Sequence, residues 1–63
     1  MSDWVHLEDV EILKETEKAF LVDLDGEEYW LPKSQILDAD EYREGDEGTL
    51  SISAWIAREK GLS

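Results

Sequence analysis

The sequence predicts a mainly β protein, built as a small four-stranded curled sheet or a partly open SH3-like or OB-like barrel with a short C-terminal helix. Three observations favour this class: a strand pattern interrupted by Asp-Gly in mid-chain, period-two alternation on either side of it, and helix-start and helix-stop residues near the C-terminus. A chain of 63 residues holds one domain at most, so we expect residues 1–63 to form a single small β domain. Four strands are few for a closed OB barrel, which favours the SH3-like arrangement.

The central hairpin is the clearest element. Residues 18–24 and 27–31 flank Asp25-Gly26, which favours a two-residue turn because glycine adopts positive φ at no steric cost. This turn leaves Trp30 on the more polar face, and Pro32 should end the strand because it has no N–H to donate. The predicted cross-strand pairs are Leu24–Glu27, Asp23–Glu28, Val22–Tyr29, Leu21–Trp30 and Phe20–Leu31.

The N-terminal segment predicts a strand with a bulge. Residues 4–13 alternate between apolar and polar side chains, and the phase of the alternation changes near Glu8 and Asp9. Residues 14–17 are all polar or charged, so none of them would fill a core. They are expected to form a turn.

The segment after the hairpin predicts one helical turn, a loop and a last strand. Residues 34–38 are expected to form the helical turn, with Ile36 and Leu37 tucked under the sheet. Residues 38–48 are an acidic loop bounded by glycines, and residues 49–52 read as the last strand.

The C-terminal residues predict a short helix. Ser53 is a suitable N-cap, residues 54–60 form the helix, and Gly61 follows as the C′ residue. The apolar side chains expected to dock this helix on the sheet are Trp55, Ile56 and Leu62.

Charge narrows the class of partner. Seventeen Asp and Glu against six Lys and Arg give a formal charge of −11, which disfavours duplex DNA as a ligand and favours basic protein surfaces. The chain has no cysteine, no signal-peptide pattern and no apolar run long enough to span a membrane. We therefore expect a cytoplasmic protein without disulfides or membrane contact.

No motif in the sequence predicts catalysis, a cofactor or a metal site. An EF-hand loop counted from Asp38 would place Tyr42 and Arg43 at positions that require an oxygen ligand and glycine. His6 has no orienting partner in its strand pattern, and neither Ser34 nor Ser53 lies in a nucleophile motif. We expect a protein that is not an enzyme, with no metal and no cofactor.

The acidic loop is the candidate partner-binding surface, with an aromatic anchor beside it. Its residues are Asp38, Asp40, Glu41, Tyr42, Glu44, Asp46 and Glu47, and the further aromatic candidates are Trp30 and Tyr29. Together with Asp23 and Glu28, the loop carboxylates suggest an array that imitates DNA, while solubility through net charge is the competing explanation. A second alternative is a module of nucleic-acid metabolism that contacts single strands through Trp30 and Lys33.

Three segments of the chain carry distinctive motifs: Glu17 to Ile36, which contains Trp-Leu-Pro-Lys-Ser-Gln-Ile, then Glu44-Gly-Asp-Glu-Gly-Thr-Leu, and Ser53-Ala-Trp-Ile-Ala-Arg-Glu-Lys-Gly-Leu62. Through these motifs, most of the chain after residue 15 resembles a family of small uncharacterised proteins of bacteriophages and mobile elements. The family has no established activity, so the resemblance transfers no catalytic residue. It implies a phage or bacterial cytosolic setting near replication or recombination, where a phage-encoded inhibitor would act on a DNA-processing protein by DNA mimicry.

Overall fold

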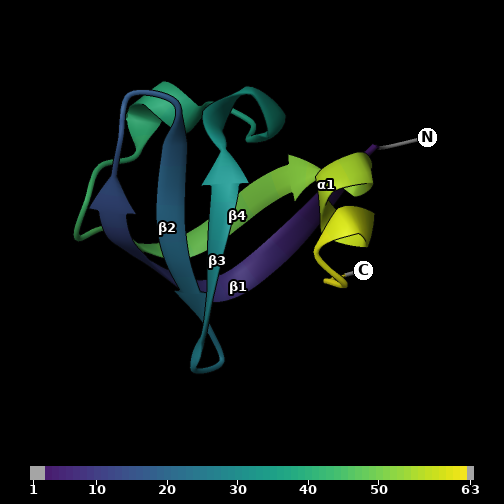
Figure 1. Cartoon of the computed structure of the whole chain (residues 1–63), viewed down its shortest axis with the longest axis horizontal. Helices are drawn as coiled ribbons and strands as arrows, with labels where there is room; N and C mark the ends of the chain where they lie inside the picture. Colours follow the sequence, from purple (N-terminus) through teal and green to yellow (C-terminus); the bar gives the residue numbers. More distant parts are fainter. Residues whose placement is uncertain (1–2, 63) are drawn as a thin grey trace.

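The chain folds as one curled antiparallel sheet of four strands, in the order β3-β2-β1-β4, followed by a short helix (Figure 1). The computed structural model describes residues 3–62. The elements are β1 (Trp4–Glu15), β2 (Ala19–Leu24), β3 (Glu27–Pro32), the 3₁₀ helices η1 (Lys33–Gln35) and η2 (Ala39–Glu41), β4 (Glu47–Ser53) and α1 (Ala54–Glu59). The predicted mainly β class with a four-stranded sheet and a C-terminal helix is confirmed, and the sheet does not close into a barrel.

The hairpin of β2 and β3 has the predicted register at every cross-strand pair. Asp25 and Gly26 occupy the turn with φ of 55° and 84°, the positive values that a two-residue hairpin turn needs. The Asp23 carboxylate accepts a hydrogen bond from the Gly26 N–H at 2.9 Å, which fixes the turn further.

Strand β1 is longer than predicted and pairs with both β2 and β4. Its register against β4 shifts between Leu7 and Val10, which confirms the predicted bulge, and Asp9 has a φ of 58° there. The prediction of a turn over residues 14–17 is wrong, because Lys14 and Glu15 still pair with β2. The actual turn follows, and the Thr16 N–H donates to the Ala19 carbonyl at 2.8 Å.

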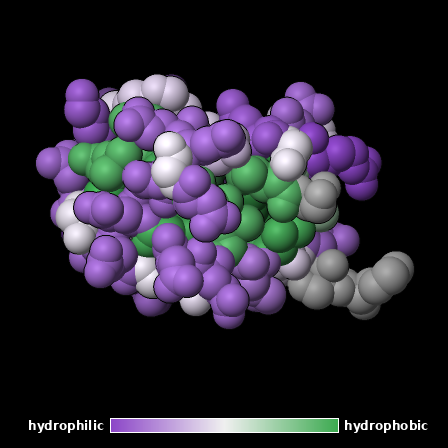
Figure 2. Space-filling model, turned by 90° about the horizontal axis from the view of Figure 1, so that it is seen from below, coloured by the Kyte–Doolittle hydropathy of each residue, from purple (hydrophilic) through white to green (hydrophobic). Residues whose placement is uncertain are grey.

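The core fills the concave side of the sheet. Its buried side chains come from all four strands, from the segment after η1 and from α1: Leu7, Val10, Ile12, Phe20, Val22, Leu31, Ile36, Leu50, Ile52, Ile56 and Ala57. Figure 2 shows hydrophobic residues reaching the surface between hydrophilic ones in the middle of the face seen from below.

The segment after β3 returns to β4 by a single backbone bridge. Ile36 is buried and bridges Ile52, and the Leu37 N–H donates to the Ser51 carbonyl at 2.9 Å. Leu37 was expected in the core, but its side chain is 39% exposed, because in extended backbone it points away from the face that Ile36 fills. The predicted helical turn over residues 34–38 is a 3₁₀ helix that begins one residue earlier and ends at Gln35.

Strand β4 begins before the predicted residue 49. Glu47 and Gly48 already pair with Glu11 and Val10 of β1, so two residues assigned to the acidic loop belong to the sheet. The inward positions of Leu50 and Ile52 are as predicted. The rest of the loop includes the 3₁₀ turn η2, which the acidic composition did not predict.

Helix α1 has the predicted caps but a different buried face. The Ser53 hydroxyl accepts a hydrogen bond from the Ile56 N–H at 3.2 Å, and Gly61 follows the helix with a φ of 72°. Ile56 and Ala57 are buried, whereas Trp55 is 58% exposed, so its predicted docking is wrong. A six-residue helix has a narrow inward stripe, and two adjacent residues already occupy it.

Candidate partner-binding surface

The acidic loop lies against the end of β1. The Gly45 N–H donates to the Ile12 carbonyl, and the Ile12 N–H donates to the Asp46 carbonyl, both at 2.8 Å. The Glu44 carboxylate also accepts a hydrogen bond from the Glu15 N–H at 3.2 Å. The sheet therefore holds residues 44–46 in place and gives the loop a defined position.

The Arg43 guanidinium forms no ion pair with a carboxylate of residues 3–62. Its guanidinium donates to the carbonyls of Asp40 and Tyr42 at 2.6 and 2.8 Å, and its N–H donates to the Asp46 carboxylate at 2.8 Å. The Asp46 carboxylate thus stabilises the loop backbone, whereas that of Glu44 binds the loop to β1. No hydrogen bond or ion pair within residues 3–62 engages the other loop carboxylates, which are those of Asp38, Asp40, Glu41 and Glu47.

The three aromatic candidates do not share one surface. Trp30 lies on the outer face of the sheet and is 46% exposed. Tyr29 is its neighbour on β3 and faces the core side, where its hydroxyl donates to the Glu27 carboxylate at 2.7 Å. This hydrogen bond and partial burial raise the pKa of Tyr29. Of the three, only Trp30 is an exposed residue.

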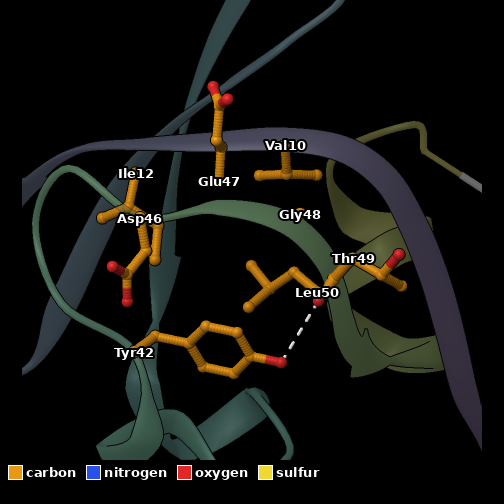
Figure 3. A pocket seen from close by; sticks show the side chains of 8 residues that line it. All are labelled: Val10, Ile12, Tyr42, Asp46, Glu47, Gly48, Thr49 and Leu50. Atoms are coloured by element: carbon orange, nitrogen blue, oxygen red, sulfur yellow. Dashed lines mark hydrogen bonds between the residues drawn. The ribbon is translucent and has the colours of Figure 1, made fainter.

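Tyr42 packs over the core beneath the acidic loop (Figure 3). Its hydroxyl donates to the Thr49 carbonyl at 3.1 Å, so the ring covers one side of β4. The pocket beside it is lined also by Val10 and Leu50, and its free volume of about 10 Å³ is far below the roughly 300–1,000 Å³ of small-molecule sites. Figure 3 shows the Glu47 carboxylate pointing away from this pocket.

The outer face of the sheet carries a row of carboxylates, of which the sequence predicted only the pair Asp23–Glu28. Glu47 pairs with Glu11, Glu11 with Asp23, and Asp23 with Glu28, so one acidic residue from each strand lies directly opposite the next. We call these four residues the acidic row. With strands about 4.8 Å apart, the row is about 14 Å long. Glu47 joins it to the acidic loop.

A second row runs beside the acidic row on the same face. Lys14 pairs with Leu21, and Leu21 pairs with Trp30. The outer face therefore places an exposed aromatic ring next to Glu28, at the β3 end of the acidic row. Trp30 was predicted on this face and was expected beside the loop, but its strand neighbours are the carboxylates of the row.

Lys33 forms an ion pair with Glu15 of the same chain. Its ammonium lies 2.7 Å from the Glu15 carboxylate and 4.9 Å from the centre of the Phe20 ring. The hydrogen bond from Lys33 lowers the pKa of Glu15. This is the only ion pair among residues 3–62, so no cation is paired with the acidic row, and the cation required for single-strand contact beside Trp30 is already neutralised.

The described part of the chain contains neither a candidate metal site nor a membrane-spanning helix. No group of three or more His, Cys, Asp and Glu side chains within residues 3–62 could hold a metal ion. Over the same residues, no helix has the length and apolar character needed to cross a membrane. Comparisons of the chain with protein-family models, with curated proteins and with solved structures find no match.

Proposed function

We propose that this protein is a non-catalytic acidic binding protein that docks on a basic surface of another macromolecule. The observation that carries the proposal is the acidic row, which crosses all four strands on one face and pairs with no cation among residues 3–62. Like charges directly opposite each other destabilise a sheet. The row therefore does not serve the fold, and its negative charge is available to a partner rich in Lys and Arg.

The most specific form of this proposal is DNA mimicry. Carboxylates repeat about every 4.8 Å across the sheet, so the outer face presents one line of negative charge, which is flanked on the same face by Lys14, Leu21 and Trp30. An open hollow lined by Asp9, Glu47 and Gly48 lies at the β4 end of the row and could receive a cationic side chain. The partner would be a nucleic-acid-binding protein whose DNA site is occupied by this face.

The resemblance to phage and mobile-element proteins supplies a biological setting for the same proposal. A phage-encoded protein of this kind would inhibit a host or phage DNA-processing protein. Single-strand contact through Trp30 and Lys33 receives less support, because Lys33 is bonded to Glu15.

The test compares two variants of equal net charge. In the first, three residues of the acidic row are neutralised, by Glu11→Gln, Asp23→Asn and Glu28→Gln. The Asn retains an oxygen that accepts from the Gly26 N–H. In the matched control, three exposed carboxylates off the row are neutralised, by Asp3→Asn, Glu17→Gln and Glu59→Gln. Each immobilised protein is exposed to a bacterial lysate, and bound proteins are eluted with a duplex oligonucleotide or with salt.

We expect the original chain and the control to retain DNA-binding proteins that the duplex releases, and the row variant to retain few of them. Association should also slow as salt rises, since the Debye length falls from about 10 Å at 0.1 M to about 3 Å at 1 M. Equal retention by the two variants, with circular dichroism showing both folded, would mean that the row is only part of a solubilising surface.

A further inference from the structure

One edge strand of the sheet, β4, is covered by other parts of the chain, whereas the other edge strand, β3, is not paired on its outer side within residues 3–62. On β4, the Ser51 carbonyl accepts from the Leu37 N–H and the Thr49 carbonyl accepts from the Tyr42 hydroxyl, so the chain covers this edge with its own loop. On β3, no strand within residues 3–62 pairs with the outer edge, since β3 is the first strand in the sheet order. An uncovered edge presents unpaired N–H and C=O groups.

The register identifies which backbone groups of β3 are available. The Lys33 N–H donates to the Lys18 carbonyl, so this is a hydrogen-bonded pair of the β2–β3 ladder. Bonded and non-bonded pairs alternate along an antiparallel ladder. The pairs Asp23–Glu28 and Leu21–Trp30 are therefore non-bonded, and the N–H and C=O groups of Glu28 and Trp30 point away from β2.

We propose that the free edge of β3 at Glu28 and Trp30 accepts an extended, Lys- and Arg-rich segment of a partner protein as an added strand. This inference rests on the proposed function and states how the basic partner is engaged: backbone hydrogen bonds form along the edge while cationic side chains face the acidic row. Glu28 belongs to both features, because its carboxylate ends the row and its backbone lies on the edge. Pro32 sets the C-terminal limit of the added strand, since it offers no N–H.

Charge selects a basic segment over a second copy of this chain. Glu27 and Glu28 are both exposed on β3, and the whole chain carries a formal charge of −11. Pairing two such edges would bring like charges together, which is a common way for proteins to prevent edge-to-edge association. A Lys- and Arg-rich strand meets attraction at the same place.

The test uses three short peptides: alternating lysine and valine, the same peptide with N-methylated backbone amides, and alternating glutamate and valine. Amide hydrogen exchange supplies the site-specific measurement. In the free protein, the amides of Glu28 and Trp30 should exchange quickly while those of Tyr29 and Leu31, which bond to β2, are protected. The lysine peptide should slow exchange at Glu28 and Trp30, and N-methylation should weaken binding about tenfold.

A pair of variants separates backbone from charge. Glu28→Gln and Glu28→Pro both remove the carboxylate, but only the proline removes the N–H that points outward. We expect the lysine peptide to bind the proline variant about tenfold more weakly than the glutamine variant. If the proline variant does not fold, the exchange measurements on the unmodified chain still show whether the peptide bonds to the Glu28 and Trp30 amides.

Two outcomes would overturn the inference while leaving the proposed function intact: equal binding of the N-methylated peptide, or protection confined to amides outside β3. Equal binding of the glutamate peptide would refute the choice of a basic segment, and a concentration-dependent dimer that protects the same amides would assign the edge to a second copy. If neither lysine peptide binds at low salt, the proposed function fails with the inference.

Discussion

Neutralising the centre of the acidic row should stabilise the fold. Glu11 lies between Glu47 and Asp23, so Glu11→Gln removes two like-charge contacts at once. Opposed carboxylates about 6 Å apart repel by about 0.7 kcal/mol in water. A Debye length of about 8 Å at 0.15 M reduces this to about 0.3 kcal/mol for each neighbour. The free energy of unfolding should therefore rise by about 0.6 kcal/mol, which corresponds to about 3–5 °C in Tm.

Thermal unfolding at two salt concentrations tests this value. The control is Glu17→Gln, which lowers the negative charge equally in the turn before β2, where the residue has no cross-strand partner in the described sheet. At about 1 M salt the Debye length of about 3 Å should shrink the gain from Glu11→Gln to about 1 °C. Equal shifts for the two variants, or a gain that persists at high salt, would refute the argument that adjacent carboxylates repel along the row.

Two further predictions concern the turn and the ion pair. Gly26→Val should lower the free energy of unfolding by about 1–3 kcal/mol, because a β-branched residue is strained at positive φ. No atom lies within 4 Å of the added Cβ, so an unchanged denaturation curve would show that backbone strain is absent. Lys33→Met should reduce the acid-dependent part of stability contributed by Glu15, because the hydrogen bond from Lys33 is the largest cause of the lowered pKa of that carboxyl. That carboxyl has a lowered pKa in the folded state, so its contribution is present above the unfolded value of about 4.3 and is lost as pH falls through the folded value. Melting curves at neutral and acidic pH check this, and equal acid sensitivity in both proteins would contradict it.

The hairpin was predictable because its register depends on local chemistry. Asp25-Gly26 dictates a two-residue turn, and that turn fixes every pair between β2 and β3, including Leu21 with Trp30. The caps of α1 were predictable for the same reason, since Ser53 and Gly61 act on backbone groups within a few residues.

Features that depend on long-range pairing were not predictable in this way. The alternation around Val10 and Ile12 places Glu11 on the outer face, but it does not say which residue of which strand lies opposite. The acidic row requires the registers of β1 against both neighbours, including the bulge at Asp9 and the shift before Lys14. The prediction that Trp55 docks on the sheet was wrong for a related reason. Its hydrophobicity suggested burial, but the inward positions of the short helix are occupied by other residues.

The arrangement of the carboxylates bears on why the chain is acidic. Solubility depends mainly on net charge, which would be served by carboxylates at any exposed positions. Placing four of them in direct opposition adds a repulsion that scattered placement would avoid. Edge protection explains Glu28, because a charge beside an unpaired strand discourages association with another copy. It does not explain Glu11, which lies on a central strand away from either edge. A partner that meets the whole outer face with positive charge accounts for both positions, and it is the acidity of the central strand that favours this explanation over solubility or edge protection alone.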